Sequence, residues 1–410
     1  FKYLNDNKRI LTKKNNCEPI IKYVSAKNKK RKRSINIKKN QWLHHYLDAT
    51  KTKDIDLIVE LIGGAEGPAK KLVFEALKNK KHVVTANKAL IAKYGDQLSR
   101  IAEKNKVNLE FEASVCGGVP IIRSLKEGLI ANKISKIYGI LNGTSNYILS
   151  SMDKENKNFN EVLSDAKKLG YAESNPTADL NGDDVSSKLK ILSSLCFNSF
   201  LNKHIYVEGI KDIDKADIDN SNKLGYKIKL LAFAEILNNK ICQRVHPVLI
   251  KKNSYIAGID GVLNAVLVEG RPVGQSIIQG EGAGPSATTS ALISDISSIL
   301  RGNIKFPFSV SSKERKKLKY VGIDGRFFSA YLRFEVIDKP GVLSNITNIF
   351  SKNKVSIKRL VQNPNKNKKN SSIIIVTHLS KNSSLEKVMK EVSKKKYVNR
   401  KPKLIRIDNS

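Results

Sequence analysis

The chain has 410 residues, and this length predicts two or three domains because single hydrophobic cores stop growing at roughly 250 to 300 residues. Its 74 Lys and Arg residues outnumber the 38 Asp and Glu residues and give a formal net charge of +36. Hydrophobic residues make up 40% of the chain, and none of its apolar runs approaches the ~18 residues that a membrane span requires. We therefore expect a soluble globular protein with no membrane partner.

The high positive charge by itself suggests nucleic-acid binding, which would show as steeply salt-dependent affinity. The lysines, however, are spread along the whole chain, and the aromatic residues that could stack on bases amount to only 7%. We interpret the charge as a solvated basic surface and expect no nucleic-acid partner. The one dense basic run, 27–33 (KNKKRKR), needs a separate explanation.

The four cysteines, at positions 17, 116, 196 and 242, are far apart and form no CxxC pair. This spacing predicts neither a disulfide framework nor a zinc site, and it favours a reducing compartment. With no signal-peptide pattern at the start, we expect a cytoplasmic protein.

The first third of the chain alternates strand and helix patterns. Strands are predicted at 19–26, 55–62, 82–86 and 107–113, and helices begin near Pro68 and Asn87. The run 55–62 (IDLIVELI) is nearly all apolar, as in a strand covered on both faces. This order predicts βαβ units and a parallel sheet, which binds ligands at the carboxyl ends of its strands. The residues at those ends are Gly63, Gly64, 85–88 and 114–119.

A dinucleotide-binding sheet opens with a strand, a GxGxxG loop and a helix, and no such segment precedes Ile20. The first residue is Phe1, not Met. We expect that the chain is N-terminally truncated and lacks the first strand and its GxGxxG loop.

The middle of the chain reads as an α+β domain. Helices are predicted at 160–169, 184–197 and 223–234, and strands at 136–141, 205–210, 244–249 and 265–269. The segment 280–284 (GEGAG) precedes Pro285 and resembles a loop that leads into a helix N-terminus, a place where anions bind. A mobile loop is the simpler interpretation of that segment.

The last eighty residues follow a β-α-β-β-α-β order, which predicts a ferredoxin-like domain. Its strands are expected at 329–337, 355–360, 372–378 and 403–407, with helices up to Phe350 and over 385–394. A polar hairpin loop is expected at 363–370, and a hinge at 311–327.

The densest polar cluster is 170–188 (GYAESNPTADLNGDDVSSK). Asp184 and Lys188 are four residues apart at the start of a predicted helix and so share one face. An exposed ion pair with a capping aspartate explains these two residues alone. It does not explain why a loop rich in Gly and Pro presents Glu173 and Asp179 just before the helix. The cluster favours a site that holds a ligand ammonium group beside a lysine able to protonate an oxygen.

Other candidate residues are fewer. Lys88 follows a strand end at the ligand-binding edge of the sheet, and a cation at a helix N-terminus is unfavourable, which favours a function over simple solvation. Cys116 has no nearby His and His246 precedes Pro247 in an apolar strand, so both are interpreted as structural.

Several segments together resemble bacterial homoserine dehydrogenase with a C-terminal ACT domain, over residues 18–410. They are VELIGG (59–64), HVVTANKAL (82–90), FEASVCGGVPII (111–122), GILNGTSNYIL (139–149), the cluster 170–188 and RVHP (244–247). The resemblance implies a Rossmann-type α/β nucleotide-binding domain at 1–119, to which the chain returns near 285–310. It further implies an α+β catalytic and dimerisation domain at 120–310 and a ferredoxin-like ACT domain at 328–410.

The family interconverts L-homoserine and L-aspartate 4-semialdehyde with NAD(P), on the route to threonine, methionine and isoleucine. By the matching motifs, the resemblance implies that Lys188 gives and takes the substrate proton, with Asp184 also in the catalytic group. It places Glu173, Asp184 and Asp179 at the substrate and Lys88 at the junction of cofactor and substrate.

Cofactor and ion sites are implied in the same way. Gly63, Gly170 and Gly282 match positions near the nicotinamide nucleotide, and the backbone carbonyls of Glu112, Val115, Gly117 and Val119 match a sodium site of the family. The basic residues Lys27, Lys29, Lys30 and Arg31 stand where an acidic residue would bind an NAD ribose, which favours NADP.

Regulation and assembly are expected from the resemblance alone. The ACT domain implies an effector, often threonine, near the turn 338–343, and a homodimer or homotetramer. Two alternatives remain open: another NAD(P) oxidoreductase of an amino-acid semialdehyde, and a non-catalytic amino-acid sensor derived from such an enzyme.

Overall fold

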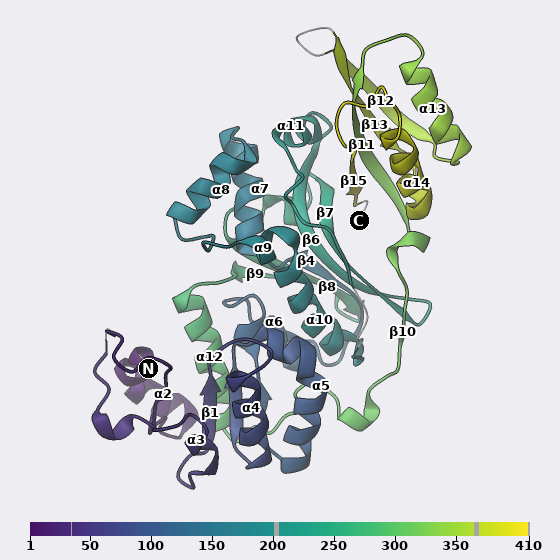
Figure 1. The fold of residues 1–410 in the computed structure, drawn as a ribbon. Helices are drawn as coiled ribbons and strands as arrows, with labels where there is room; N and C mark the ends of the chain where they lie inside the picture. The colour runs from purple at the N-terminus through teal and green to yellow at the C-terminus, as the bar shows by residue number, and fades with distance from the viewer. Residues whose placement is uncertain (34, 201–204, 365–368, 409–410) are drawn as a thin grey trace. The chain divides into compact units, whose positions relative to one another are not determined.

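The computed structural model describes residues 1–33, 35–200, 205–364 and 369–408 (Figure 1). The chain forms two compact units, each assembled from three separate segments. The first comprises Phe1–Ile137, Ser187–Asn202 and Asn264–Leu318, and the second comprises Tyr138–Ser186, Lys203–Leu263 and Lys319–Ser410. Among the described residues, none of the helices combines the length and the apolar character that crossing a membrane requires.

The first unit contains the predicted parallel sheet. Its strands β1 (Leu57–Glu60), β2 (His82–Thr85) and β3 (Leu109–Glu110) lie in that order, and both pairs are parallel. They are connected by α4 (Pro68–Lys78) and α5 (Lys88–Asn105). Pro68 occupies the first turn of α4, where a missing N–H costs nothing, and the Asn87 side chain accepts the Leu90 N–H at the start of α5. The βαβ prediction is therefore confirmed.

Two local predictions in this region are wrong. No strand forms at 19–26, where Val24 makes only an isolated bridge to Trp42. The run 55–62 is not covered on both faces, because Ile58 and Glu60 are buried while Val59 is 38% exposed. An apolar run shows that a strand forms, but it does not show how many of its faces are covered.

The first unit also contains the helix that follows the Gly-rich segment. Strands β4 (Lys133–Ile140), β8 (Leu263–Arg271) and β9 (Gly274–Glu281) are neighbours in one sheet, and α12 (Pro285–Leu300) begins directly after Gly284. Helix α12 packs against β2 and against α2 (Lys8–Asn15). The other helices of the first unit are α1 (Lys2–Asp6), α3 (Asp48–Lys51), α6 (Ile121–Arg123) and the C-terminal part of α10 (Asp183–Phe197).

The second unit is built around a long antiparallel pair, β6 (Tyr226–Leu237) and β7 (Lys240–Lys251), which are hydrogen-bonded along their whole length. The helix predicted at 223–234 is therefore wrong. Helix α11 (Lys215–Lys223) ends where that helix was expected to begin, and Gly225 turns the chain with a φ of 86°. The apolar run that follows is buried on both faces of the sheet, and such a run lacks the alternation that marks a strand.

The C-terminal domain lies within the second unit and has the predicted ferredoxin-like order. Strands β11 (Phe327–Ile337), β12 (Ile357–Pro364), β13 (Asn370–Thr377) and β15 (Lys403–Ile407) pair in the order β12-β13-β11-β15. Helices α13 (Val342–Lys352) and α14 (Asn382–Ser393) supply Ile346, Phe350 and Leu385 to its hydrophobic core. The predicted hairpin loop at 363–370 lies partly outside the described residues.

The sheet of the C-terminal domain continues into β7. Strand β15 pairs with β7 in parallel, with Arg406 opposite Val248 and Ile407 opposite Leu249. The short strands β5 (Tyr206–Val207) and β10 (Lys319–Tyr320) also pair with β7 in parallel. Helices α7 (Gly143–Glu155), α8 (Phe159–Lys168) and α9 (Thr177–Asn181) and the short strand β14 (Ser380–Lys381) complete the second unit.

Candidate active site

The first turn of α7 organises the acidic cluster in the second unit. Asn142 precedes this helix in an extended conformation, and its Oδ1 accepts the Ser145 N–H at 2.8 Å, the geometry of an N-cap. A side chain at Gly143 would place its Cβ 2.7 Å from the Val262 carbonyl oxygen. Only glycine therefore allows α7 to start at this place.

Asn142 also brings two of the predicted aspartates together. Its Nδ2 donates to Asp179 Oδ1 at 2.8 Å and to Asp184 Oδ2 at 2.9 Å. Asp179 lies on α9 and Asp184 in the first turn of α10, and Gly182 joins the two helices with a φ of 87°. Two carboxylates that are 37 and 42 residues from Asn142 thus flank one nitrogen atom.

The same turn of α7 fixes the loop that leads to these aspartates. Thr144 Oγ1 donates to the Tyr171 carbonyl at 2.7 Å, and Ser145 Oγ donates to the Asp179 carbonyl at 2.9 Å. The segment between α8 and α9 is therefore held at both of its ends by consecutive residues of α7.

The remaining residues predicted in this cluster differ in their surroundings. Lys188 lies on α10 one turn after Asp184, and both side chains are buried, with 9% and 7% of their surface exposed. Glu173 is exposed in the loop between α8 and α9, and Gly170 follows α8 with a φ of 75°. Sequence reasoning missed Asn142; its only signal is an Asn directly before a helix, which usually indicates a cap and nothing more.

In the first unit, a buried carboxylate shapes the carboxyl ends of β1 and β2. Glu60 Oε1 accepts the N–H groups of Ile62 and Gly63 at 2.6 and 2.9 Å, and Glu60 Oε2 accepts the Thr85 hydroxyl at 2.6 Å. Gly63 and Gly64 follow with φ values of 84° and 81°, and a Cβ at Gly63 would meet no atom within 4 Å. The backbone here is thus bent and open, which suits close approach of a nucleotide.

Lys88 is the first residue of α5 and is half-buried at the end of β2. Asn87 beside it donates from Nδ2 to the Gly64 carbonyl at 2.8 Å, and this bond ties the loop after β1 to the loop after β2. The structure therefore brings Gly63 and Lys88 to the same edge of the parallel sheet, as the sequence predicted for strand-end residues.

Gly282 lies between β9 and α12 in close contact with other main-chain segments. A Cβ at Gly282 would lie 2.2 Å from the side chain of Asn264, and a Cβ at Gly117 would lie 3.0 Å from the Gly282 carbonyl oxygen. The amide of Asn264 is fully buried, and neither of its polar atoms has a partner within the described part of the chain. Gly117 therefore permits two loops to pack backbone against backbone, and Gly282 leaves room for the Asn264 amide.

The segment 112–119 carries the four carbonyl groups expected to bind sodium. Cys116 and Gly117 have φ values of 55° and 37°, so the chain reverses sharply here. The Glu112 carboxylate accepts the N–H groups of Ile122 and Arg123 at 2.9 and 2.7 Å. Burial raises the pKa of Glu112 to about 7, although these two N–H groups act in the opposite direction.

Asp295 of α12 joins this buried group by accepting the Glu112 N–H at 2.9 Å, and Lys126 pairs with Glu110 at 2.8 Å. Three buried carboxylates thus face two cations, the second being Arg123 beside Asp295 at 3.3 Å. Burial also raises the pKa of Asp295 to about 7, so the charge of this buried group changes around neutral pH. The neutral carbonyl oxygens of the segment are the kind of ligand that a hard cation prefers. The described residues contain no group of three His, Cys, Asp or Glu side chains that could hold a metal ion.

The basic run 27–33 forms a compact, exposed loop. Asn28 Oδ1 accepts the N–H groups of Lys30 and Arg31 at 3.0 and 3.2 Å. Lys29 Nζ donates to the Leu43 carbonyl at 2.7 Å, and the Arg33 guanidinium lies 5.2 Å from the centre of the Trp42 ring. Lys27, Lys30 and Arg31 present exposed cationic side chains.

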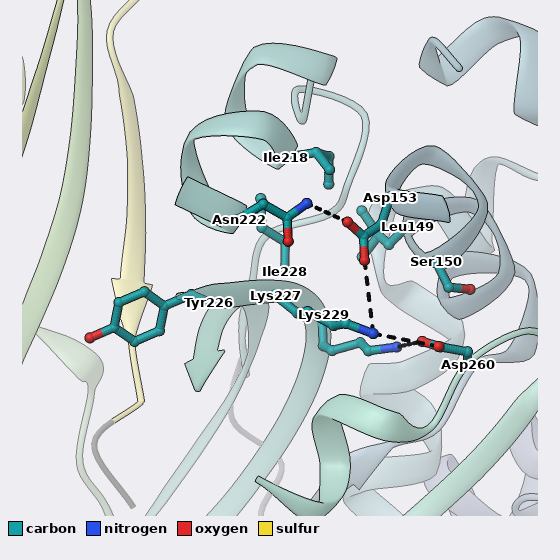
Figure 2. A pocket seen from close by; sticks show the side chains of 10 residues that line it. All are labelled: Leu149, Ser150, Asp153, Ile218, Asn222, Tyr226, Lys227, Ile228, Lys229 and Asp260. Atoms are coloured by element: carbon teal, nitrogen blue, oxygen red, sulfur yellow. Dashed lines mark hydrogen bonds and ion pairs between the residues drawn. The ribbon is translucent and has the colours of Figure 1, made fainter. Parts of the chain in front are cut away.

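A separate small pocket in the second unit is lined by residues of α7, α11 and β6 and by Asp260, and Lys229 in its lining anchors α7 (Figure 2). Lys229 Nζ donates to Asn146 Oδ1, to the Ile259 carbonyl and to Asp260 at 3.0, 2.6 and 2.8 Å. These acceptors use all three donors of the buried ammonium group.

His246, in β7, is buried outside this pocket, with its Nδ1 at 3.0 Å from the Pro247 carbonyl oxygen.

Comparison with known proteins agrees with the fold. The family model described as the NAD binding domain of homoserine dehydrogenase matches residues 7–112, that of homoserine dehydrogenase matches residues 120–297, and an AHAS small subunit-like ACT domain matches residues 332–400. The class of protein is therefore a nicotinamide-nucleotide oxidoreductase with an ACT domain.

Individual relatives agree along nearly the whole chain. A homoserine dehydrogenase of Bacillus subtilis is 35% identical over 96% of this chain and 91% of its own, and one of Neisseria gonorrhoeae is 41% identical over 82% and 78%. The crystal structure of a homoserine dehydrogenase from Thiobacillus denitrificans has a TM-score of 0.90 at 35% identity and covers 99% of this chain and 94% of its own.

The chain belongs to the homoserine dehydrogenase family. The expected Rossmann-type, catalytic and ACT parts and the enzymatic interpretation are confirmed, and the non-catalytic alternative is not supported.

Proposed function

We propose that the homoserine dehydrogenase reaction is carried by Lys188 with Asp184, Asp179 and Glu173. The observation that supports this assignment is the pair of aspartates gathered at the start of α10, one helical turn before a buried lysine. A buried lysine near carboxylates keeps its charge and its position, and both are needed to protonate an oxygen that gains negative charge.

The two aspartates bind the ammonium group of L-homoserine or L-aspartate 4-semialdehyde, with Glu173 closing the site from the exposed loop. The nicotinamide cofactor, when bound, supplies and accepts the hydride. Lys188 donates a proton to the alkoxide oxygen as the aldehyde is reduced, and it takes that proton back when the alcohol is oxidised. Lys88 contributes a positive charge where the cofactor and the substrate meet.

The test is the variant Lys188→Ala, with Lys190→Ala on another face of the same helix as the matched control. General acid–base groups contribute about 100- to 10,000-fold, so kcat should fall by that factor in Lys188→Ala while the cofactor Kd, measured by fluorescence titration, stays unchanged. Lys190→Ala should keep normal kcat. Near-normal turnover in Lys188→Ala would overturn the assignment.

We further propose NADP as the preferred cofactor, held in part by Gly63, Gly170 and Gly282. The support is the exposed cationic group of Lys27, Lys30 and Arg31 on the loop 27–33. A 2′-phosphate is attracted to such a group, whereas an NAD ribose calls for an acidic residue. The homoserine dehydrogenase of a hyperthermophilic archaeon, 28% identical with a TM-score of 0.54, is in complex with NADPH.

Steady-state KM values for NADP and NAD in the wild type and in Lys30→Ala/Arg31→Ala test this preference. The NADP KM should rise and the NAD KM should stay unchanged, with Lys38→Ala/Lys39→Ala as the control for loss of exposed charge. Equal KM values for the two cofactors in the wild type would refute the preference.

Sodium binding by the carbonyls of Glu112, Val115, Gly117 and Val119 is part of the same proposal. The neutral set of oxygen donors, on a segment that reverses sharply at Cys116 and Gly117, supports it. Titration of the protein with sodium chloride against choline chloride at constant ionic strength should raise the melting temperature only with sodium. Equal melting curves in the two salts would refute the site.

The ACT domain is proposed to bind an amino-acid effector, with threonine as the expected one. A cavity of about 290 Å³ is lined by the turn from Asp338 to Leu343 and by Gln362 and Ile373. Gly341, with a φ of 87°, places the N-terminus of α13 at this turn, where a carboxylate is stabilised. Titrating threonine and a panel of aliphatic amino acids in the activity assay tests this; no inhibition and no thermal shift with any of them would refute it.

The remaining expectations are proposals of the same kind. We assign nucleotide binding to 1–119 with the return at 285–310, catalysis and dimerisation to 120–310, and regulation to 328–410. A homodimer or homotetramer in the cytoplasm is expected, and light scattering of the purified protein measures the assembly.

A further inference from the structure

Asn142 uses every hydrogen-bonding group of its side chain. Its Oδ1 accepts the Ser145 N–H, and its Nδ2 supplies one N–H to Asp179 and one to Asp184. Among the side chains, only the amides of Asn and Gln combine two donors on one neutral nitrogen with an acceptor. A serine or an aspartate can replace the cap but cannot hold two carboxylates from one atom.

Asp179 and Asp184 are stabilised by a neutral group that donates a hydrogen bond to each of them. Carboxylates brought together repel each other, and partial burial raises the cost of keeping both charged. Hydrogen bonds donated to the charged forms offset this repulsion without adding a positive charge that would compete with a cationic ligand. Each carboxylate has about four acceptor positions, so one amide bond leaves capacity for a substrate ammonium group.

The helix that carries Asn142 is itself fixed. One turn further along α7, Asn146 Nδ2 donates to the carbonyls of Ile259 and Leu263, both at 3.1 Å, and its Oδ1 accepts from the buried Lys229. Asp260 anchors Lys229 in turn at 2.8 Å. Asn142 is therefore presented from a rigid support, and its two N–H groups have a constant direction.

We propose that Asn142 is a positioning residue of the reaction: its single amide nitrogen sets the separation of Asp179 and Asp184 and thereby forms the subsite for the α-ammonium group of the substrate. This inference rests on the proposed function, in which the aspartates bind that group. It assigns to Asn142 a role in substrate affinity that is distinct from capping α7.

Two substitutions separate positioning from capping. Asn142→Asp has the same shape and is an equal or better cap, because a negative charge is favourable at a helix N-terminus. Asn142→Ser is also a good cap but is too short to reach both aspartates. Capping alone predicts that the aspartate variant behaves like the wild type, whereas positioning predicts that it is the more damaged of the two.

The experiment measures kcat and KM for L-homoserine, KM for NADP and the melting temperature of each variant. We expect the homoserine KM to rise about 10- to 100-fold in Asn142→Asp, the range that a lost charge-assisted hydrogen bond gives, and by a smaller factor in Asn142→Ser. The NADP KM should not change. Asn158→Asp, at the exposed N-cap of α8, is the matched control and should change neither KM.

A double-mutant cycle keeps the inference testable if the aspartate variant does not fold. In the background of Asp179→Asn, which no longer presents two charges, the effect of Asn142→Ser on the homoserine KM should shrink several-fold. Full additivity, or a wild-type homoserine KM in a folded Asn142→Asp variant, overturns the inference. Normal turnover in Lys188→Ala would instead overturn the proposed function, so the two failures are distinguishable.

Discussion

Replacement of Arg333 by methionine should strongly destabilise the second unit. Arg333 projects from β11 with its guanidinium almost fully buried, and its Nε contacts Asp217 at 2.8 Å. The other nitrogen atoms reach Asp214 at 2.6 Å and Glu335 at 2.7 Å. Asp214 and Asp217 belong to the N-terminus of α11, so one side chain connects the C-terminal domain to a helix beside β6.

The expected loss in the free energy of unfolding follows from the burial of Asp217, which has no exposed surface. Burial raises the pKa of Asp217 above its ordinary value, and Arg333 only partly offsets this. Removing one partner of such a pair leaves an uncompensated buried charge, at a cost of about 3–5 kcal/mol. Methionine keeps most of the side-chain volume, so the loss reports on the charge and its hydrogen bonds.

The assay is unfolding by urea, followed by circular dichroism, with Lys401→Met as the matched control. Lys401 pairs with Asp212 at 3.4 Å, but both side chains are largely exposed, and such pairs contribute less than ~1 kcal/mol. Adding Asp217→Asn to Arg333→Met should restore part of the lost stability, because the orphaned charge is removed. Equal effects of Arg333→Met and Lys401→Met would refute the reasoning.

Three further results are expected. Gly143→Ala should lower kcat/KM for homoserine at least ~10-fold, since its Cβ would lie 2.7 Å from the Val262 carbonyl and displace the start of α7; unchanged steady-state kinetics would contradict this. Gly282→Ala should lower the melting temperature and raise the NADP KM, because its Cβ would overlap the side chain of Asn264 at 2.2 Å; wild-type values of both in thermal-shift and kinetic assays would argue against this packing. Burial, reinforced by nearby arginines, holds the pKa of His246 well below 6.5. The unfolded chain then binds a proton that the folded chain does not, so the free energy of unfolding falls below pH 6.5 by up to ~1.4 kcal/mol per pH unit. His246→Phe should reduce that slope in denaturant titrations between pH 5 and 7, and identical slopes would exclude the contribution.

The strands and helices that carry local signals could be predicted from the sequence. The cap at Asn87, Pro68 in a first helical turn and the alternation over the strand of 329–337 each mark an element through its own residues. The helix predicted at 223–234 was wrong because this run carries no local signal that separates a strand from a helix. Its residues form β6 by pairing with β7, which lies beyond a turn, and that pairing is not encoded in the run itself.

The candidate site was predictable only in part. Asp184 and Lys188 share a helix, so their spacing shows that they lie on one face. Asp179 and Asp184 are brought together by Asn142, which is 37 and 42 residues away, and only the fold brings that amide to them. An Asn before a helix has the same local pattern whether it caps the helix or also organises two acids.

The pairing of β15 with β7 has a practical consequence for any variant that lacks the ACT domain. Truncation of the chain before residue 328 would remove β15, the strand that pairs with Val248 and Leu249 of β7. The sheet edge exposed in this way is apolar and could pair with other chains, which leads to aggregation. The truncation would also remove the ion pair between Arg406 and Glu208, whose atoms lie 3.1 Å apart. The proposed effector site is therefore better tested by single substitutions around the turn at Gly341 than by removal of the whole domain.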